Sequence, residues 1–179
     1  MLDKSERYLI VGLGLLGGKY ALELTKAGFT VDGINRSEKH LQYALDKGYI
    51  RSGKTHDFED LVSGADYVIF GLYPTALLTW FETYGRLLKP GCICTDVSGV
   101  KTGLVGPVQE MCPPGVEFIA SHPMAGRETS SVEHAAEVNF APANFIITPT
   151  EKNTPEGIAW VAELAQVLGL SAPPQWIES

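Results

Sequence analysis

The chain has 179 residues, of which 45% are hydrophobic and 20% are charged, and this composition is typical of a folded globular protein with one core. Its net charge of -7 argues against a nucleic-acid partner, because such binding depends on clustered lysine and arginine. No stretch approaches the roughly 20 apolar residues of a membrane span, and the charged start does not resemble a signal peptide, so we expect a cytoplasmic protein without a membrane partner.

Short apolar runs alternate with helical stretches along the chain. Strands are expected at residues 8–12, 29–35, 66–72, 92–97, 117–122 and 144–149. Helices are expected at 15–27, 37–48, 74–88 and 154–168, and a further helix after the strand at 92–97 is expected to end at about residue 111. Strands and helices that alternate in this way form parallel strands joined by right-handed crossovers. The pattern predicts an α/β fold, a doubly wound, Rossmann-type, mostly parallel sheet with helices on both faces. We expect it to occupy residues 1–170, with 171–179 as a linker or the truncated start of a helical C-terminal domain.

The three cysteines are the first candidates for chemistry. Cys92 and Cys94 lie two apart on an apolar run, and Cys112 precedes two prolines. A metal or redox pair is one interpretation, but no further cysteine or histidine follows at ligand spacing. We therefore expect buried thiols and no metal site.

A glycine pattern follows the first predicted strand. Gly12, Gly14 and Gly17 form G-x-G-x-x-G between a strand and a helix, and Gly18 adds a fourth small residue. In a dinucleotide-binding loop the first glycine permits the tight turn, the second admits the pyrophosphate, and the third allows close helix packing. The helix start, with Leu15 and Leu16, then receives the anion. The alternative is an ordinary glycine-rich turn.

The end of the second predicted strand selects the dinucleotide. An NAD-preferring fold has an acidic residue there, which binds the ribose 2′-hydroxyl. This chain has Asn35, Arg36 and Ser37 instead, which offer donors and a positive charge to a 2′-phosphate, and Asp32 is poorly placed as a replacement. We predict NADP, with NAD possible. Alternatively, Arg36 stacks on adenine or lies in solvent.

Two later motifs follow strands that end at the same edge of the predicted sheet: TDVSGVK at 95–101 and SHPMAGRE at 121–128. His122 sits on a rigid turn, and histidine side chains titrate near neutrality, which suits removal of a hydroxyl proton during alcohol oxidation. A histidine after a strand can also serve packing or capping. Further cofactor contacts are expected at this edge from Leu72, Tyr73, Pro74 and Asp96.

The segments VGLGLLGG, TDVSGVK and HPMAGRE, in this order, resemble the nucleotide-binding domain of prephenate/arogenate dehydrogenases, enzymes of tyrosine biosynthesis. The resemblance covers nearly the whole chain. It implies oxidative decarboxylation of prephenate or arogenate with hydride transfer to nicotinamide. It also implies that His122 hydrogen-bonds the ring hydroxyl of the substrate and promotes its deprotonation.

The resemblance assigns further residues. Lys101 matches the lysine of the family's D-x-x-S-V-K motif and would lie near nicotinamide and substrate, although an exposed lysine at a helix start is the other interpretation. The family's serine falls at Gly99 here, so Ser98 is the nearest candidate hydroxyl. Arg127, beside the HPMAG turn, is expected to bind a carboxylate of the substrate.

A helical C-terminal domain follows in this family and supplies dimer contacts and cationic groups. This sequence ends at Ser179, where that domain would begin. We therefore predict cofactor binding ahead of turnover, and a homodimer only as a possibility, because the usual helical interface is absent. Two alternatives remain: a reductase of the 6-phosphogluconate or β-hydroxyacid dehydrogenase type, and a non-catalytic NADP-binding module.

Overall fold

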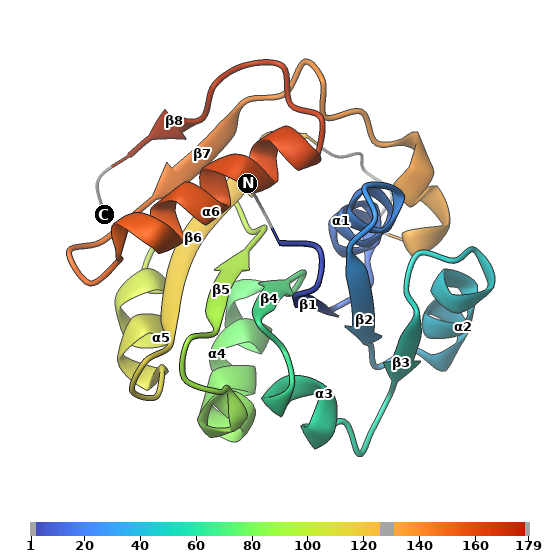
Figure 1. The fold of residues 1–179 in the computed structure, drawn as a ribbon, viewed down its shortest axis with the longest axis horizontal. Helices are drawn as coiled ribbons and strands as arrows, with labels where there is room; N and C mark the ends of the chain where they lie inside the picture. The colour runs from blue at the N-terminus through green and yellow to red at the C-terminus, as the bar shows by residue number, and fades with distance from the viewer. Residues whose placement is uncertain (1–2, 126–130, 178–179) are drawn as a thin grey trace.

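The computed structural model describes residues 3–125 and 131–177. Within them, eight strands form one sheet in the order β3-β2-β1-β4-β5-β6-β7-β8 (Figure 1). The strands are β1 (Arg7–Val11), β2 (Thr30–Ile34), β3 (Ser52–Lys54), β4 (Tyr67–Phe70), β5 (Ile93–Asp96), β6 (Glu117–Pro123), β7 (Phe145–Thr148) and β8 (Gln175–Trp176). Only the β6–β7 pairing among these strands is antiparallel. The prediction of a doubly wound, mostly parallel sheet is confirmed.

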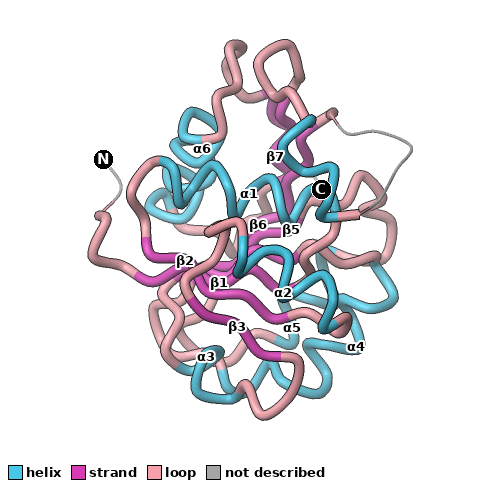
Figure 2. Tube along the Cα trace, turned by 90° about the vertical axis from the view of Figure 1, so that its right-hand side faces the viewer, coloured by secondary structure: helices cyan, strands magenta, loops and turns pink. Residues whose placement is uncertain are grey.

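Helices cover both faces of the sheet, as Figures 1 and 2 show. The elements are α1 (Leu15–Lys26), α2 (Glu38–Asp46), α3 (Glu59–Ser63), α4 (Pro74–Tyr84), α5 (Val105–Met111), α6 (Pro155–Val167) and the 3-10 helices η1 (Gly85–Leu87) and η2 (Val132–Glu137). One hydrophobic cluster joins α1, α2, α6 and η2 to one face, and a second joins α3, α4 and α5 to the other. Successive residues of β1 alternate between them: Tyr8 and Ile10 pack in the first cluster, and Leu9 and Val11 in the second.

The segment expected to be a linker contributes to the sheet. Gln175–Trp176 form the short strand β8 beside β7, and the Ile177 N–H donates to the Ile147 carbonyl at 3.0 Å. This strand was not predicted, because its two residues, preceded by two prolines, show no alternation of polar and apolar side chains. At least part of residues 171–177 is therefore fixed to the edge of the sheet.

Two features of the sheet create space at the carboxyl ends of its strands. The strand order reverses between β1 and β4, which is where such folds bind ligands. In addition, the β5–β6 ladder ends at the pair Thr95–Ile119, and β6 continues alone with β7 from Ala120 onward. Strands β5 and β6 therefore diverge at this edge, just before His122.

Within the described parts of the chain, no helix has the length and apolar character needed to cross a membrane.

Candidate functional site

The glycine loop between β1 and α1 is tightly packed. Gly12 has φ of +96°, a conformation that favours glycine, and a Cβ on it would lie 2.6 Å from the Gly71 carbonyl oxygen. A Cβ on Gly17 would overlap the Gly12 carbonyl oxygen. Gly12 therefore makes the turn, and Gly17 lets α1 approach β1. Gly18 has another function: a Cβ there would lie 2.7 Å from Cγ2 of Val132, so this glycine admits η2.

The start of α1 fits an anionic group. Its N-cap, Gly14, has no side chain to accept a hydrogen bond, and the first turn contains no acidic residue. The first bond of the helix runs from the Gly18 N–H to the Gly14 carbonyl at 2.9 Å, so the amides of Leu15, Leu16 and Gly17 have no acceptor within the helix. These amides and the helix dipole suit the diphosphate of a dinucleotide.

The end of β2 is joined to this loop. The Asn35 Oδ1 accepts the Leu13 N–H at 3.0 Å, and its Nδ2 donates to the Ser37 carbonyl at 3.1 Å. Ser37 caps α2, its hydroxyl oxygen accepting the His40 N–H at 3.2 Å, and Arg36 is exposed. Asn35 thus lies beside the glycine loop, with Arg36 and Ser37 next to it.

Asp32, by contrast, does not lie at the ligand edge. It is buried, pairs with Arg51 at 3.1 Å and accepts the Ser52 hydroxyl at 2.7 Å. Its carboxylate therefore has a structural role in β2 and does not replace the acid that an NAD site uses.

The residues after β4 lie at the same edge as the glycine loop. A Cβ added to Gly12 would lie 2.9 Å from Cδ2 of Leu72, so the Leu72 side chain lies against the glycine loop. Tyr73 follows with 81% of its surface exposed, and Pro74 begins α4. The predicted contacts of these residues with a cofactor stay predictions.

His122 is held in one orientation at the end of β6. Its Nδ1 lies 2.9 Å from the Val97 carbonyl oxygen, which can only accept, so Nδ1 carries the proton. In the neutral imidazole, Nε2 is then the nitrogen with the lone pair. A Cβ on Gly99 would lie 3.0 Å from Nε2, so the basic nitrogen faces the loop after β5.

Lys101, in the loop after β5, forms an ion pair with Asp96 at the end of β5. Lys101 Nζ donates to the two carboxylate oxygens of Asp96 at 2.5 and 2.6 Å and to the Ser121 carbonyl at 2.8 Å. Burial raises the pKa of Asp96 and lowers the pKa of Lys101, and each charge opposes the shift of the other. The interpretation of Lys101 as an exposed lysine is wrong. The Asp96 carboxylate is fully buried against Lys101 and Ser121, and the predicted contact of Asp96 with the cofactor stays a prediction.

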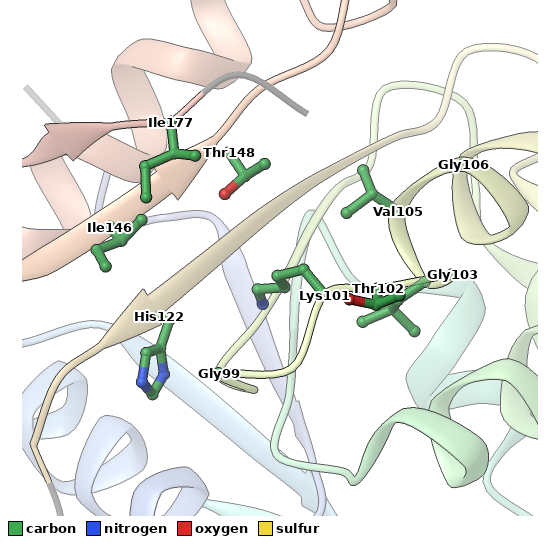
Figure 3. Close-up of a pocket in the computed structure, with 11 residues that line it drawn as sticks. Gly99, Lys101, Thr102, Gly103, Val105, Gly106, His122, Ile146, Thr148 and Ile177 are labelled. Carbon is green, nitrogen blue, oxygen red and sulfur yellow. The ribbon is translucent and has the colours of Figure 1, made fainter.

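A pocket of about 470 Å³ opens beside His122. Figure 3 shows His122 and Gly99 near one another at one end, with Lys101 pointing between the loop and β6. The lining residues are Gly99, Lys101, Thr102, Gly103, Leu104, Val105, Gly106, His122, Ile146, Thr148 and Ile177. Sequence reasoning missed Ile146 and Thr148, although their alternate positions on a predicted strand place them on one face.

Ser98, a predicted site residue, lies outside the pocket. The Ser98 hydroxyl oxygen accepts the Val100 N–H at 3.2 Å and donates to the Val100 carbonyl at 3.3 Å, so it is engaged within its own turn. Arg127 lies outside the described residues, and its predicted contact with a substrate carboxylate stays a prediction.

A family model described as "Prephenate dehydrogenase, nucleotide-binding domain" matches residues 20–171. The chain belongs to this family. The prephenate dehydrogenase of Bacillus subtilis is 28% identical over 166 residues, which are 92% of this chain and 45% of that protein. The chain spans about half the length of the curated relatives it matches.

Solved structures agree with this assignment. The Synechocystis arogenate dehydrogenase has a TM-score of 0.83 at 25% identity, covering 97% of this chain and 59% of that one. The prephenate dehydrogenase of Aquifex aeolicus, solved with hydroxyphenyl propionate and NAD+, has a TM-score of 0.81 at 25% identity, with the same coverage. Membership in the prephenate dehydrogenase family replaces the alternative of a β-hydroxyacid dehydrogenase type.

Proposed function

We propose that this chain is the cofactor-binding part of an NADP-linked prephenate or arogenate dehydrogenase and carries its general base, His122. The observation that supports this most directly is the 2.9 Å contact of His122 Nδ1 with the Val97 carbonyl. It leaves Nε2 as a proton acceptor beside a pocket at the ligand edge of the sheet. The family membership supports the same function, and so does the first turn of α1, which contains no acidic residue that would repel a diphosphate.

The proposed reaction needs only the substrate, His122 and an oxidised nicotinamide as the hydride acceptor. His122 Nε2 takes the proton of the ring hydroxyl while hydride leaves the carbon that bears it. The nicotinamide, when bound, supplies the hydride acceptor. The ring carboxylate then leaves as carbon dioxide, and its bonding electrons make the ring aromatic. The new phenolate oxygen recovers the proton from His122, which restores the base.

NADP is our proposal for the dinucleotide. The neutral amide of Asn35 reaches the glycine loop, exposed Arg36 follows it, and no carboxylate of a described residue takes the place of Asn35. A 2′-phosphate would find the positive charge of Arg36 there. The Aquifex aeolicus relative was solved with NAD+, so binding of NAD is the direct competitor to measure.

The substrate site requires more than the described residues provide. Prephenate carries two carboxylates, and the Lys101 ammonium that lines the pocket is already paired with Asp96. We propose that Arg127 and groups outside this chain bind them, the latter through a C-terminal domain or a second copy. We also propose a cytoplasmic location, as the composition indicates.

One observation favours a second function. With Lys101 paired and Gly99 in place of the family's serine, the pocket offers a bound dianion little attraction. A non-catalytic NADP-binding module would have the same glycine loop and would not need that attraction.

Steady-state assays decide between the two functions. The chain is mixed with NADP+ or NAD+ and with prephenate or arogenate, and formation of the reduced cofactor is followed by absorbance. We expect turnover with NADP+ and one of the two substrates, at a high KM because part of the carboxylate binding lies outside this chain. Tight NADP+ binding without turnover of either substrate, even at high substrate concentration, would favour the binding module.

A further inference from the structure

Side chains replace the backbone ladder where β5 and β6 diverge. The ladder ends at Thr95–Ile119, yet Ser121 still directs its N–H and its carbonyl toward β5. Asp96 Oδ1 accepts that N–H at 3.1 Å, and Lys101 Nζ donates to that carbonyl at 2.8 Å. The ion pair therefore occupies the place that a neighbouring strand would take.

The ammonium group of Lys101 has no donor left for a ligand. A lysine ammonium has three N–H groups, and here they face Asp96 Oδ1, Asp96 Oδ2 and the Ser121 carbonyl. Moving one of them to a substrate carboxylate would break a contact with the buried Asp96 carboxylate or with the Ser121 carbonyl. Although Lys101 lines the pocket, its contacts thus point into the protein.

The contact between Asp96 and Ser121 lies next to the contact that orients His122, the proposed base. Asp96 and Val97 are adjacent, and so are Ser121 and His122. Asp96 holds Ser121 through its carboxylate, and Val97 holds the His122 ring through its carbonyl. If the distance between Asp96 and Ser121 changes, the distance between the Val97 carbonyl and the His122 ring changes as well, because the two contacts join the same two short backbone segments.

We propose that Lys101 is a positioning residue, which locks Asp96 to Ser121 and thereby holds His122 Nδ1 on the Val97 carbonyl. This inference rests on the proposed function of His122 and assigns Lys101 a role other than substrate or cofactor binding. The pairing of β6 with β7 remains when the lysine is lost, but the ion pair no longer sets the distance from β6 to the Val97 carbonyl, and the imidazole ring then samples other orientations and tautomers.

Lys101→Met is the direct test, and Lys101→Arg is the conservative variant. Lys89→Met is the matched control, because Lys89 pairs with Asp66 at 2.7 Å and donates to the Gly64 carbonyl at 3.4 Å, just ahead of β5 at the opposite edge of the sheet. Each variant is compared with wild type by nitrogen-15 NMR of the His122 ring, by NADP+ affinity, and by kcat and KM.

In Lys101→Met we expect the Nδ1–H signature of His122 to give way to averaged tautomers and kcat to fall by about tenfold or more. KM and NADP+ affinity should change less than threefold, Lys101→Arg should recover part of the loss, and Lys89→Met should resemble wild type. A KM raised about tenfold with unchanged kcat would overturn the proposal, and so would an unchanged NMR signature.

Two further outcomes are distinguishable. If wild type does not turn over either substrate, the proposed function fails, whereas the NMR comparison still decides whether Lys101 positions His122. If Lys101→Met does not fold because Asp96 is left unpaired, the double variant Asp96→Asn/Lys101→Met removes both charges and keeps an acceptor for the Ser121 N–H. The double variant must also lose the Nδ1–H signature, and retention of it overturns the proposal.

Discussion

The Nδ1 atom of His122 lies 2.9 Å from the carbonyl oxygen of Val97. This contact orients the ring so that Nε2 faces Gly99, where any side chain would come within 3.0 Å of the basic nitrogen. The absence of a side chain at position 99 is therefore part of the geometry of the base.

Substitution of Gly99 by alanine tests this geometry. The added Cβ would lie 3.0 to 3.4 Å from three atoms of the His122 ring, so the ring must move or Nε2 becomes covered. We expect kcat to fall by about tenfold or more, as misplacement of a reacting group does, with NADP+ affinity unchanged. Gly106→Ala is the control, because it lines the same pocket and a Cβ there meets nothing within 4 Å. Equal kcat values in the two variants would contradict the prediction.

The Asn35→Asp variant tests cofactor preference. An aspartate retains an acceptor for the Leu13 N–H, but it loses the donor to the Ser37 carbonyl and brings a negative charge toward the 2′-phosphate. NADP+ affinity should fall by about tenfold, or 1.4 kcal/mol, relative to NAD+ affinity. Titration calorimetry with both cofactors measures the ratio, with NAD+ as the internal control. An unchanged ratio would show that Asn35 does not select the phosphate.

Gly18→Ala tests the packing of η2 on α1. Alanine favours a helix by about 1 kcal/mol over glycine, but here its Cβ would lie 2.7 Å from the buried Val132. Overpacking should prevail, with a net loss of about 1–2 kcal/mol in the free energy of unfolding by urea. Gly106→Ala, also within a helix but with open space around it, should instead gain about 0.5–1 kcal/mol. A stabilised Gly18→Ala would mean that η2 does not press on α1.

The cysteines should be unreactive in the folded protein. Cys92 and Cys94 are free and buried, as predicted, and Cys112 is half-buried. Burial raises the pKa of the Cys112 thiol to about 12 and that of Cys94 well above its usual value, so little thiolate exists at pH 8. Ellman's reagent should label no thiol before unfolding and three after it. Rapid labelling of the native protein would contradict this burial.

Most of the fold could be predicted from local patterns in the sequence. The alternation of Tyr8 to Val11 between two cores marks a strand buried on both faces, and Gly12 and Gly17 mark the turn and the close helix approach. The unpredicted strand β8 has two residues and depends on β7, to which it is joined by pairing rather than by its own pattern. Such elements are set by tertiary contacts.

The features of the site also divide into those that local sequence predicts and those that depend on tertiary contacts. His122 and Asn35 were predicted because each lies at the carboxyl end of a predicted strand, at the ligand edge. The ion pair of Lys101 was not, since it depends on where the β5–β6 ladder ends, a feature that no local pattern encodes. Ser98 was chosen as the nearest hydroxyl, and only the turn geometry showed its bonds to Val100.

The central claim is tested most directly by comparing wild type with His122→Asn. NADP+ affinity and turnover of prephenate and arogenate are measured on both proteins. We predict that the variant binds NADP+ as wild type does and loses about 10²–10⁴-fold in kcat, because proton removal loses its base while the glycine loop is untouched. Equal turnover in the two proteins would contradict the assignment of His122.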